Sequence, residues 1–282
     1  MGRKSSLLFA LVAPLALAVL MSGCASVSSS SFPVAPSSAP ASSPSSSPVV
    51  SAKPTAPTVT LPLVVCPTTS GLASTPGPKS LPAVVNVSVA GGASTTGLAV
   101  YTDDQGTMKL LGPAGWACSA QYGADGSGGV VVSPSGENVP PNWGAGWNLP
   151  AGSSVRAIIG FQTGGCANCR DALACALFST AAKSFKTDFG RPCPGVRPGA
   201  ETTQQVNPDI VAFDDPAGVV GDGIPSGGKY AANGVLTYYS GSQNGSWLET
   251  CTMPDASRHL CTATLDYFLG AYGTRLPEVA LT

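Results

Sequence analysis

The chain has 282 residues, which is enough for one or two domains. Only 10% of the residues are charged, against about 25% in an average soluble protein, and the formal net charge is −1. No basic excess is present to neutralise phosphates, so the composition argues against nucleic-acid binding. The 34 glycines and 26 prolines lie above average usage but below that of a wholly disordered chain.

The first 24 residues have the features of an export signal. Arg3 and Lys4 give a positive start, and the apolar run over residues 7–21 is too short for a comfortable bilayer span. The run ends in residues 21–24 (MSGC), which resemble the bacterial lipobox, with methionine where most lipoboxes carry leucine. The resemblance implies that residues 1–23 are removed as a lipoprotein signal peptide.

The same resemblance implies that Cys24 receives lipid, and this lipid would be the membrane attachment. Low lysine content with abundant alanine, glycine and proline is typical of actinobacteria. We therefore expect an actinobacterial-type lipoprotein on the outer face of the cytoplasmic membrane.

Residues 24–60 are expected to form a tether. Residues 25–60 contain 13 serines and 7 prolines, and Lys53 is their only charge. Such a segment cannot bury enough apolar surface to offset the entropy lost on ordering. We expect it to be disordered and to hold an extracytoplasmic globular domain, residues 61–282, away from the bilayer.

The globular part is expected to be α+β and β-rich. Short strands separated by Asp/Gly turns predict an antiparallel, sandwich- or barrel-like first half. These strands are Pro82–Ala90, Gly97–Thr102, Thr107–Leu111, Ala117–Tyr122 and Gly129–Ser133. The second half mixes strands with helices, and a subdivision near residue 150 stays open.

The strands expected in the second half are Val155–Phe161, Asp209–Phe213, Val235–Tyr239 and Ser246–Met253. Apolar residues at four-residue steps predict one helix over Asn168–Phe185. A final helix is expected after Asp255, a plausible N-cap. Its apolar stripe would comprise Leu260, Thr264, Leu265, Phe268 and Leu269.

Eight cysteines remain when Cys24 is set aside, and an even number in an exported chain predicts disulfides. They are Cys66, Cys118, Cys166, Cys169, Cys175, Cys193, Cys251 and Cys261. Proximity along the chain favours the pairs Cys66–Cys118 and Cys251–Cys261, which leaves the central four to pair among themselves. Cys169 and Cys175 are neither three nor four positions apart, so on one helix they would have different partners.

Two other interpretations of the central cysteines stay open. Cys166 and Cys169 form a Cys-x-x-Cys pair at a helix start, where the helix dipole favours a thiolate, so a thiol–disulfide activity is one alternative. Together with Cys175 and Cys193 they could also supply four sulfurs to zinc. The oxidising compartment favours disulfides, so we expect no metal and no cofactor.

Aromatic side chains suggest a binding surface. Trp143 and Trp147 lie in a Gly/Pro-rich stretch, and Tyr238 and Tyr239 flank a possible hairpin. Exposed Trp and Tyr stack on sugars and anchor protein contacts. The alternative is that these rings only close the end of a sheet.

Catalytic candidates are few. Asp214, Asp215 and Asp222 cluster after a strand, and paired acids could hydrolyse glycosidic bonds. Any Ser/His/Asp triad would need His259, the only histidine, and one histidine cannot build a histidine-based metal site.

Together these features predict a non-catalytic binding or cell-envelope module whose partner is a cell-wall polymer or an envelope protein. A carboxylate hydrolase and a thiol–disulfide protein are the alternatives. A deep acidic cleft would favour the hydrolase, and a flat aromatic face would favour the binder.

Overall fold

A computed structural model describes residues 58–71, 77–89, 92–137, 152–165, 167–193, 201–221, 227–239 and 245–270. All of these residues belong to one compact unit. The expected signal peptide, Cys24 and nearly all of the expected tether lie outside them. No helix in the described ranges is long and apolar enough to cross a membrane.

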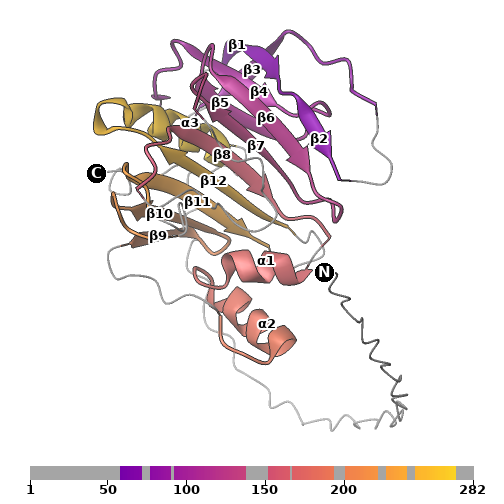
Figure 1. The fold of residues 1–282 in the computed structure, drawn as a ribbon, viewed down its shortest axis with the longest axis vertical. Coiled ribbons are helices and arrows are strands. Elements are labelled where there is room, and N and C mark those ends of the chain that lie inside the picture. Colours follow the sequence, from indigo (N-terminus) through magenta and orange to yellow (C-terminus); the bar gives the residue numbers. More distant parts are fainter. Residues whose placement is uncertain are drawn as a thin grey trace, which may run out of the picture. The chain divides into compact units, whose positions relative to one another are not determined.

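Within the described residues, twelve strands form two sheets (Figure 1). The smaller sheet has the order β3-β1-β4-β5, and the larger has the order β2-β6-β7-β8-β12-β11-β10-β9. The strands of the smaller sheet are β1 (Thr58–Val65), β3 (Val84–Ser88), β4 (Leu98–Thr102) and β5 (Lys109–Pro113). Those of the larger are β2 (Thr68–Ser70), β6 (Ala117–Tyr122), β7 (Gly128–Ser133), β8 (Ala157–Gln162), β9 (Thr202–Asn207), β10 (Ile210–Asp215), β11 (Ala232–Tyr238) and β12 (Ser246–Thr252).

One face of the larger sheet packs against the smaller sheet. Tyr101 and Leu110 of the smaller sheet share a core with Val130, Val132 and Ile158 of the larger sheet. Alternate residues of a strand point to opposite faces, so the valines of β7 at even positions enter this core. Burial of these side chains holds the two sheets together.

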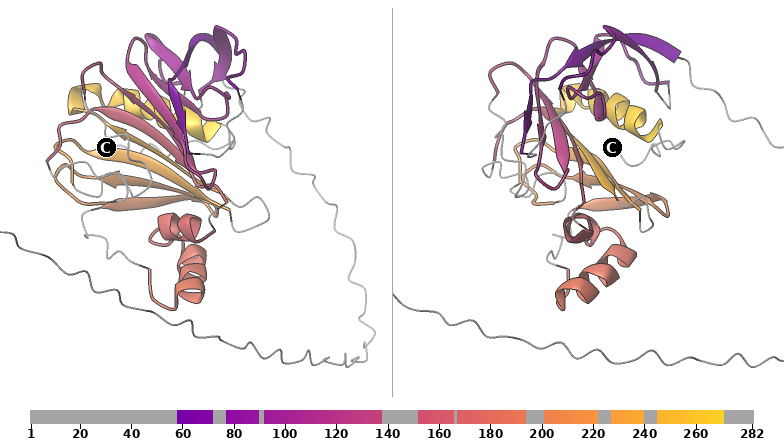
Figure 2. Two further views of the ribbon diagram at one scale, coloured as in Figure 1. Left: turned by 45° about the vertical axis from the view of Figure 1, so that its right-hand side comes forward. Right: turned by 90° about the vertical axis from the view of Figure 1, so that its right-hand side faces the viewer.

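Helix α3 (His259–Gly270) covers the rest of that face. Leu265 and Leu269 of the helix pack on Ile210 and Val235 of the sheet. In both views of Figure 2, α3 lies beside the smaller sheet, while the other two helices lie away from it. Of the expected apolar stripe, Thr264, Leu265, Phe268 and Leu269 are buried, and Leu260 is half-buried. Asp255 instead belongs to a short 3-10 turn, Asp255–Ser257, that precedes the helix.

Helices α1 (Ala167–Ala174) and α2 (Ser179–Phe189) pack on the opposite face of β10–β12. The prediction of one continuous helix here is wrong. The chain leaves the helical path at Phe178, which has an extended backbone (φ −120°, ψ 122°) and a buried ring. Phe178 and Tyr238 of the sheet have ring centroids 5.5 Å apart, so tertiary packing outweighs the helical period.

The predicted disulfides Cys66–Cys118 and Cys251–Cys261 are confirmed. Cys175 pairs with Cys193 and closes the turn around α2. Cys169 is also disulfide-bonded, and Cys166 lies outside the described residues.

The predicted fold class, α+β and β-rich with disulfides, is confirmed. Two strand pairs, β1–β4 and β2–β6, are parallel, so the expectation of a purely antiparallel first half is wrong. Strand β1 begins at Thr58, three residues before the boundary expected for the globular part. The larger sheet takes strands from both sides of residue 150.

Candidate functional site

A cleft of about 550 Å³ lies where β10 ends, β11 begins and β12 leads into α3. Its volume falls within the range of small-ligand sites. Prolines and alanines form part of its wall. The charged and aromatic side chains that line it are Asp214, Lys229, Tyr230, Asp255 and Arg258.

Strand register brings the parts of the cleft together. Asp214 lies opposite Asn233 on β11, and Ala232 lies opposite Thr252 on β12, so three strand ends are level. The loop before β11 also needs a glycine at position 227, where φ is +70°. A Cβ there would lie 2.8 Å from the carbonyl oxygen of Gly218. This close approach sets the path of the chain that carries Lys229 and Tyr230.

Asp214 contacts two other polar side chains at the cleft. Asn233 Nδ2 donates a hydrogen bond of 2.7 Å to Asp214 Oδ1, and Arg258 Nη2 lies 3.4 Å from the same oxygen. Burial raises the pKa of Asp214, and Arg258 and Asn233 offset only part of that rise. The carboxyl group therefore accepts a proton more readily than an exposed aspartate.

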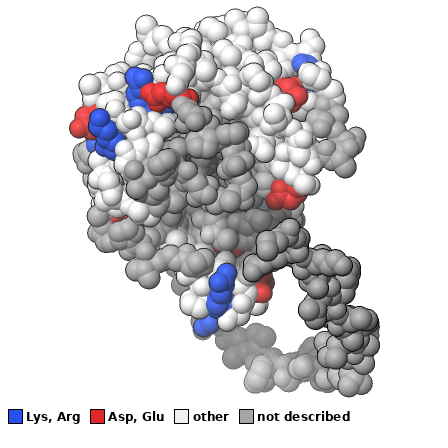
Figure 3. All heavy atoms as spheres, viewed as in Figure 1, with Lys and Arg blue, Asp and Glu red and all other residues white. Residues whose placement is uncertain are grey.

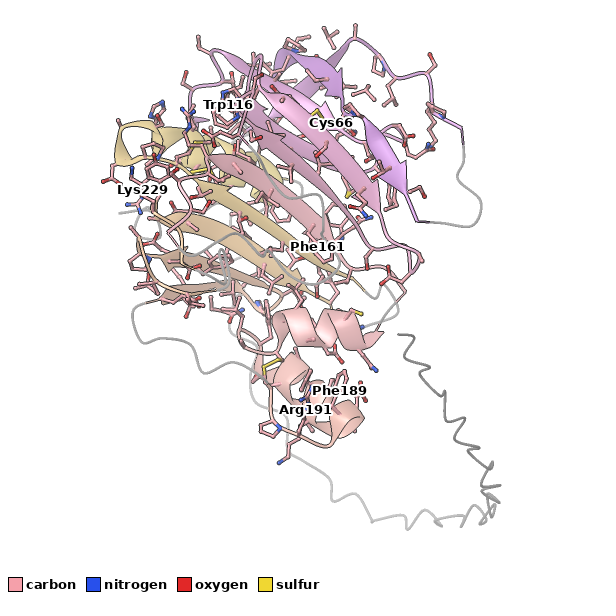
Figure 4. The ribbon with its side chains drawn as sticks, in the orientation of Figure 1. Cys66, Trp116, Phe161, Phe189, Arg191 and Lys229 are labelled. Carbon is pink, nitrogen blue, oxygen red and sulfur yellow. A yellow bond between two sulfur atoms is a disulfide. The ribbon has the colours of Figure 1, made fainter. Side chains whose placement is uncertain are left out.

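The remaining charges lie at the mouth of the cleft. Lys229 and Asp255 are exposed, and Lys229 Nζ lies 5.7 Å from the centroid of the Tyr230 ring. Figure 4 shows Lys229 projecting at the side of the larger sheet. Figure 3 shows few charges over most of this view and a group of both signs at its left edge. The cleft thus offers two cations and two carboxyl groups against apolar walls.

The structure separates two of the aspartates that the sequence had grouped. Asp215 follows Asp214 on a strand, so its side chain points to the other face of the sheet. It is 1% exposed and packs so tightly against Gly221 that a Cβ there would clash with its carboxylate. Asp222 lies outside the described residues. Asp255, which the sequence did not single out as an acid, is the carboxyl group that shares the cleft with Asp214.

His259 is the exposed first residue of α3 and does not line the cleft. The aromatic candidates are dispersed as well. Tyr238 is 2% exposed, and its hydroxyl donates a 2.9 Å hydrogen bond to Asp171 Oδ1. Tyr239 is half-buried, while Trp143 and Trp147 lie outside the described residues. Tyr238 is therefore a core residue with no surface to offer a ligand.

The structure gives the cysteine candidates different chemical roles. Cys175 and Cys193 are bonded to each other, so they cannot supply thiolates to zinc. Cys169 is exposed and lines a second hollow of about 370 Å³ beside Phe161 and Gly129. Exposed disulfides exchange more readily than buried ones, and the thiol–disulfide hypothesis stays a prediction.

Lys229, Tyr230 and Arg258 are site residues that sequence reasoning did not select. The low charge content was the available signal, because each lysine or arginine in such a chain is uncommon. Their convergence follows from strand order, which the sequence does not show.

The fold and the cleft define a disulfide-stapled α+β protein with a mixed-charge cleft at one end of its larger sheet. Within the described ranges, no group of three or more His, Cys, Asp or Glu side chains is arranged to hold a metal ion. Comparisons of the chain with models of protein families, with curated proteins and with solved structures find no match.

Proposed function

We propose that this protein is a membrane-anchored bacterial lipoprotein that acts as a non-catalytic binding module of the cell envelope. The cleft around Asp214 and Arg258 is its ligand site. The observation that carries the proposal is the convergence of charged groups of both signs and Tyr230 on one 550 Å³ cleft. A few polar groups on apolar walls are the usual composition of a small-ligand site.

The location has independent support. Three disulfides between described cysteines indicate an extracytoplasmic, oxidising environment. Lipid on Cys24, carried by the lipobox-like residues 21–24, would place the protein on the outer face of the cytoplasmic membrane. The segment up to residue 57 would then act as the tether.

Lipidation is tested by expressing the chain and its Cys24→Ser variant in a bacterium fed an alkyne-tagged fatty acid. The wild-type protein should carry the tag and partition into the detergent phase. The variant should carry no tag and partition into water. Equal labelling of both proteins would overturn the assignment of Cys24.

Binding is tested by co-sedimentation with purified insoluble cell wall. Arg258→Ala removes the guanidinium from the cleft and should lower the bound fraction about tenfold. Arg156→Ala is the matched control, because Arg156 is exposed, pairs with Glu137 and does not line the cleft. Equal sedimentation of the three proteins, or none by the wild type, would overturn the cell wall as the partner.

A hydrolase is the second candidate, and the raised pKa of Asp214 favours it. A protonated Asp214 could donate to a glycosidic oxygen while Asp255 activates water on the other side of the sugar. The wild-type protein should then release soluble fragments from the sedimented wall. Asp214→Asn should release none while still binding. Binding without release by the wild type would leave only the non-catalytic function.

A further inference from the structure

Glu249 lies inside the protein, away from the cleft. It is on β12, and its side chain is 0% exposed. Neither carboxyl oxygen has a hydrogen-bond partner among the described residues. A buried polar group is normally hydrogen-bonded, because an unpaired one loses its hydration with nothing in return. Such a group calls for a physical explanation.

Glu249 lies under α3, between two points that hold the helix on the sheet. Trp247, Glu249 and Cys251 alternate along β12 and therefore share one face. Cys251 is bonded to Cys261 near the start of α3. Trp247 meets Phe268 near the end of the helix, with ring centroids 6.5 Å apart. The first attachment is covalent, while the second depends on packing alone.

Among the residues that the structure describes, none brings a positive charge to Glu249. Its neighbours across the sheet are Val235 on β11 and Gly160 on β8. Burial therefore raises the pKa of Glu249 well above its usual value. The carboxyl group stays protonated at pH values where an exposed glutamate is ionised.

The ionisable groups on the elements around Glu249 do not change this conclusion. Helix α3 carries Tyr267, Asp266 and, as its exposed first residue, His259, while β5 carries exposed Lys109 and β4 carries buried Tyr101. Burial, and then the proximity of Glu249, raises the pKa of Tyr267 to about 12, so the phenol is neutral. Asp214 lies on the same face of β10 as Ile210, but it is paired with Arg258 at the cleft. Strands β3 and β11 carry no charged residue.

We propose that Glu249 is a proton-dependent latch for α3. The neutral carboxyl group allows the helix to lie on β12. Loss of its proton leaves a negative charge that the interior cannot hold, so the C-terminal half of α3 moves away and water reaches the carboxylate. The Cys251–Cys261 disulfide keeps the start of the helix in place and acts as the hinge. Arg258, just before the helix, stays at the cleft.

The test is hydrogen exchange of the full-length oxidised protein in detergent, followed by mass spectrometry between pH 6 and 8. Opening that releases one proton becomes more favourable as the pH rises, by up to about tenfold per pH unit while the buried carboxyl group is still protonated. After correction for intrinsic exchange, peptides covering residues 264–270 should show that slope. Residues 259–262, next to the disulfide, should show little change.

Glu249→Gln cannot ionise, so the same peptides should lose their pH dependence. Glu249→Met is a second variant if the amide destabilises the fold. Glu137→Gln is the matched control, since it removes a half-buried glutamate that is paired with Arg156, and it should keep the wild-type slope. A flat wild-type profile, or a slope that persists in Glu249→Gln, would overturn the latch. The same slope in β10 and β11 would also overturn it, because it would report global unfolding.

Discussion

Asp214 and Arg258 lie 44 residues apart in the chain, yet Arg258 Nη2 is 3.4 Å from Asp214 Oδ1. Asp214 is the penultimate residue of β10, and Arg258 immediately precedes α3, which follows β12 in the chain. Their contact therefore depends on the order β12-β11-β10 in the sheet. It also ties the wall of the cleft to the start of the last helix.

We expect Arg258→Ala to lower the free energy of unfolding by about 1–2 kcal/mol at pH 7.5. The reason is that Asp214, 17% exposed, would keep its charge without its cation. The pKa of Asp214 is already raised on folding and would rise further. A raised pKa gives stability that is present at low pH and lost as pH rises, so the deficit should shrink at pH 4.5.

Urea unfolding at the two pH values measures this deficit. Arg156→Ala provides the control and should have the smaller effect, because Arg156 is 44% exposed, against 24% for Arg258. An equal deficit for Arg258→Ala at both pH values would show that its effect is packing rather than charge.

Asp103 should stabilise the turn between β4 and β5. Its buried carboxylate accepts backbone hydrogen bonds from Gln105 (2.7 Å), Thr107 (3.0 Å) and Met108 (2.6 Å). Asp103→Ala leaves these donors without their acceptor, and we expect a loss of about 3 kcal/mol in urea unfolding. Asp104→Asn is the neighbouring control and should be close to neutral.

The same group should contribute to acid unfolding. Burial alone would raise the pKa of Asp103, but the hydrogen bonds from Met108, Tyr122, Thr107 and Gln105 outweigh it, and the pKa is lowered. A lowered pKa gives stability that is present above the unfolded value, about 3.9, and lost as pH falls through the folded value. Asp103→Asn should remove this contribution, seen as a flatter fall in stability between pH 5 and 2.5.

Glu249→Met should raise stability at pH 7.5 by about 1–3 kcal/mol, because it replaces a buried carboxyl group with an apolar side chain of similar length. The folded pKa of Glu249 is raised, so the wild type loses up to about 1.4 kcal/mol per pH unit above the unfolded pKa. The gain should therefore be smaller at pH 5. Thermal unfolding at both pH values decides this, and a gain that is independent of pH would contradict it.

Local patterns were sufficient for most of the larger sheet. The spacing of short strands between Asp/Gly turns placed β6 and β7 within one residue of their observed bounds. Strand β9 was not predicted, since its sequence TTQQVN is polar on both faces. Strand β1 was partly assigned to the tether because Thr58–Thr60 continue a Ser/Pro/Thr-rich run.

Long-range geometry explains the errors. The four-residue period runs unbroken through Leu173, Leu177 and Phe185, so nothing local predicts the break at Phe178. Burial of that ring against Tyr238 decides the path instead. The cleft has the same origin, because strand order and not sequence proximity brings its residues together. The two predicted disulfides were easier to predict, because each joins two cysteines with no other cysteine between them in the chain.

The disulfides should differ in their contribution according to the loop that each closes. Cys66–Cys118 spans 52 residues, while Cys251–Cys261 spans 10. On the chain-entropy model the longer loop stabilises by about 4 kcal/mol and the shorter by about 2.7 kcal/mol. Paired replacement by alanine should therefore lower the urea midpoint more for Cys66/Cys118. Cys66, Cys251 and Cys261 are buried and Cys118 is partly buried, so the cavity effect partly cancels in this comparison. A larger loss for Cys251/Cys261 would instead show that its main role is to hold α3 on β12 in the folded state.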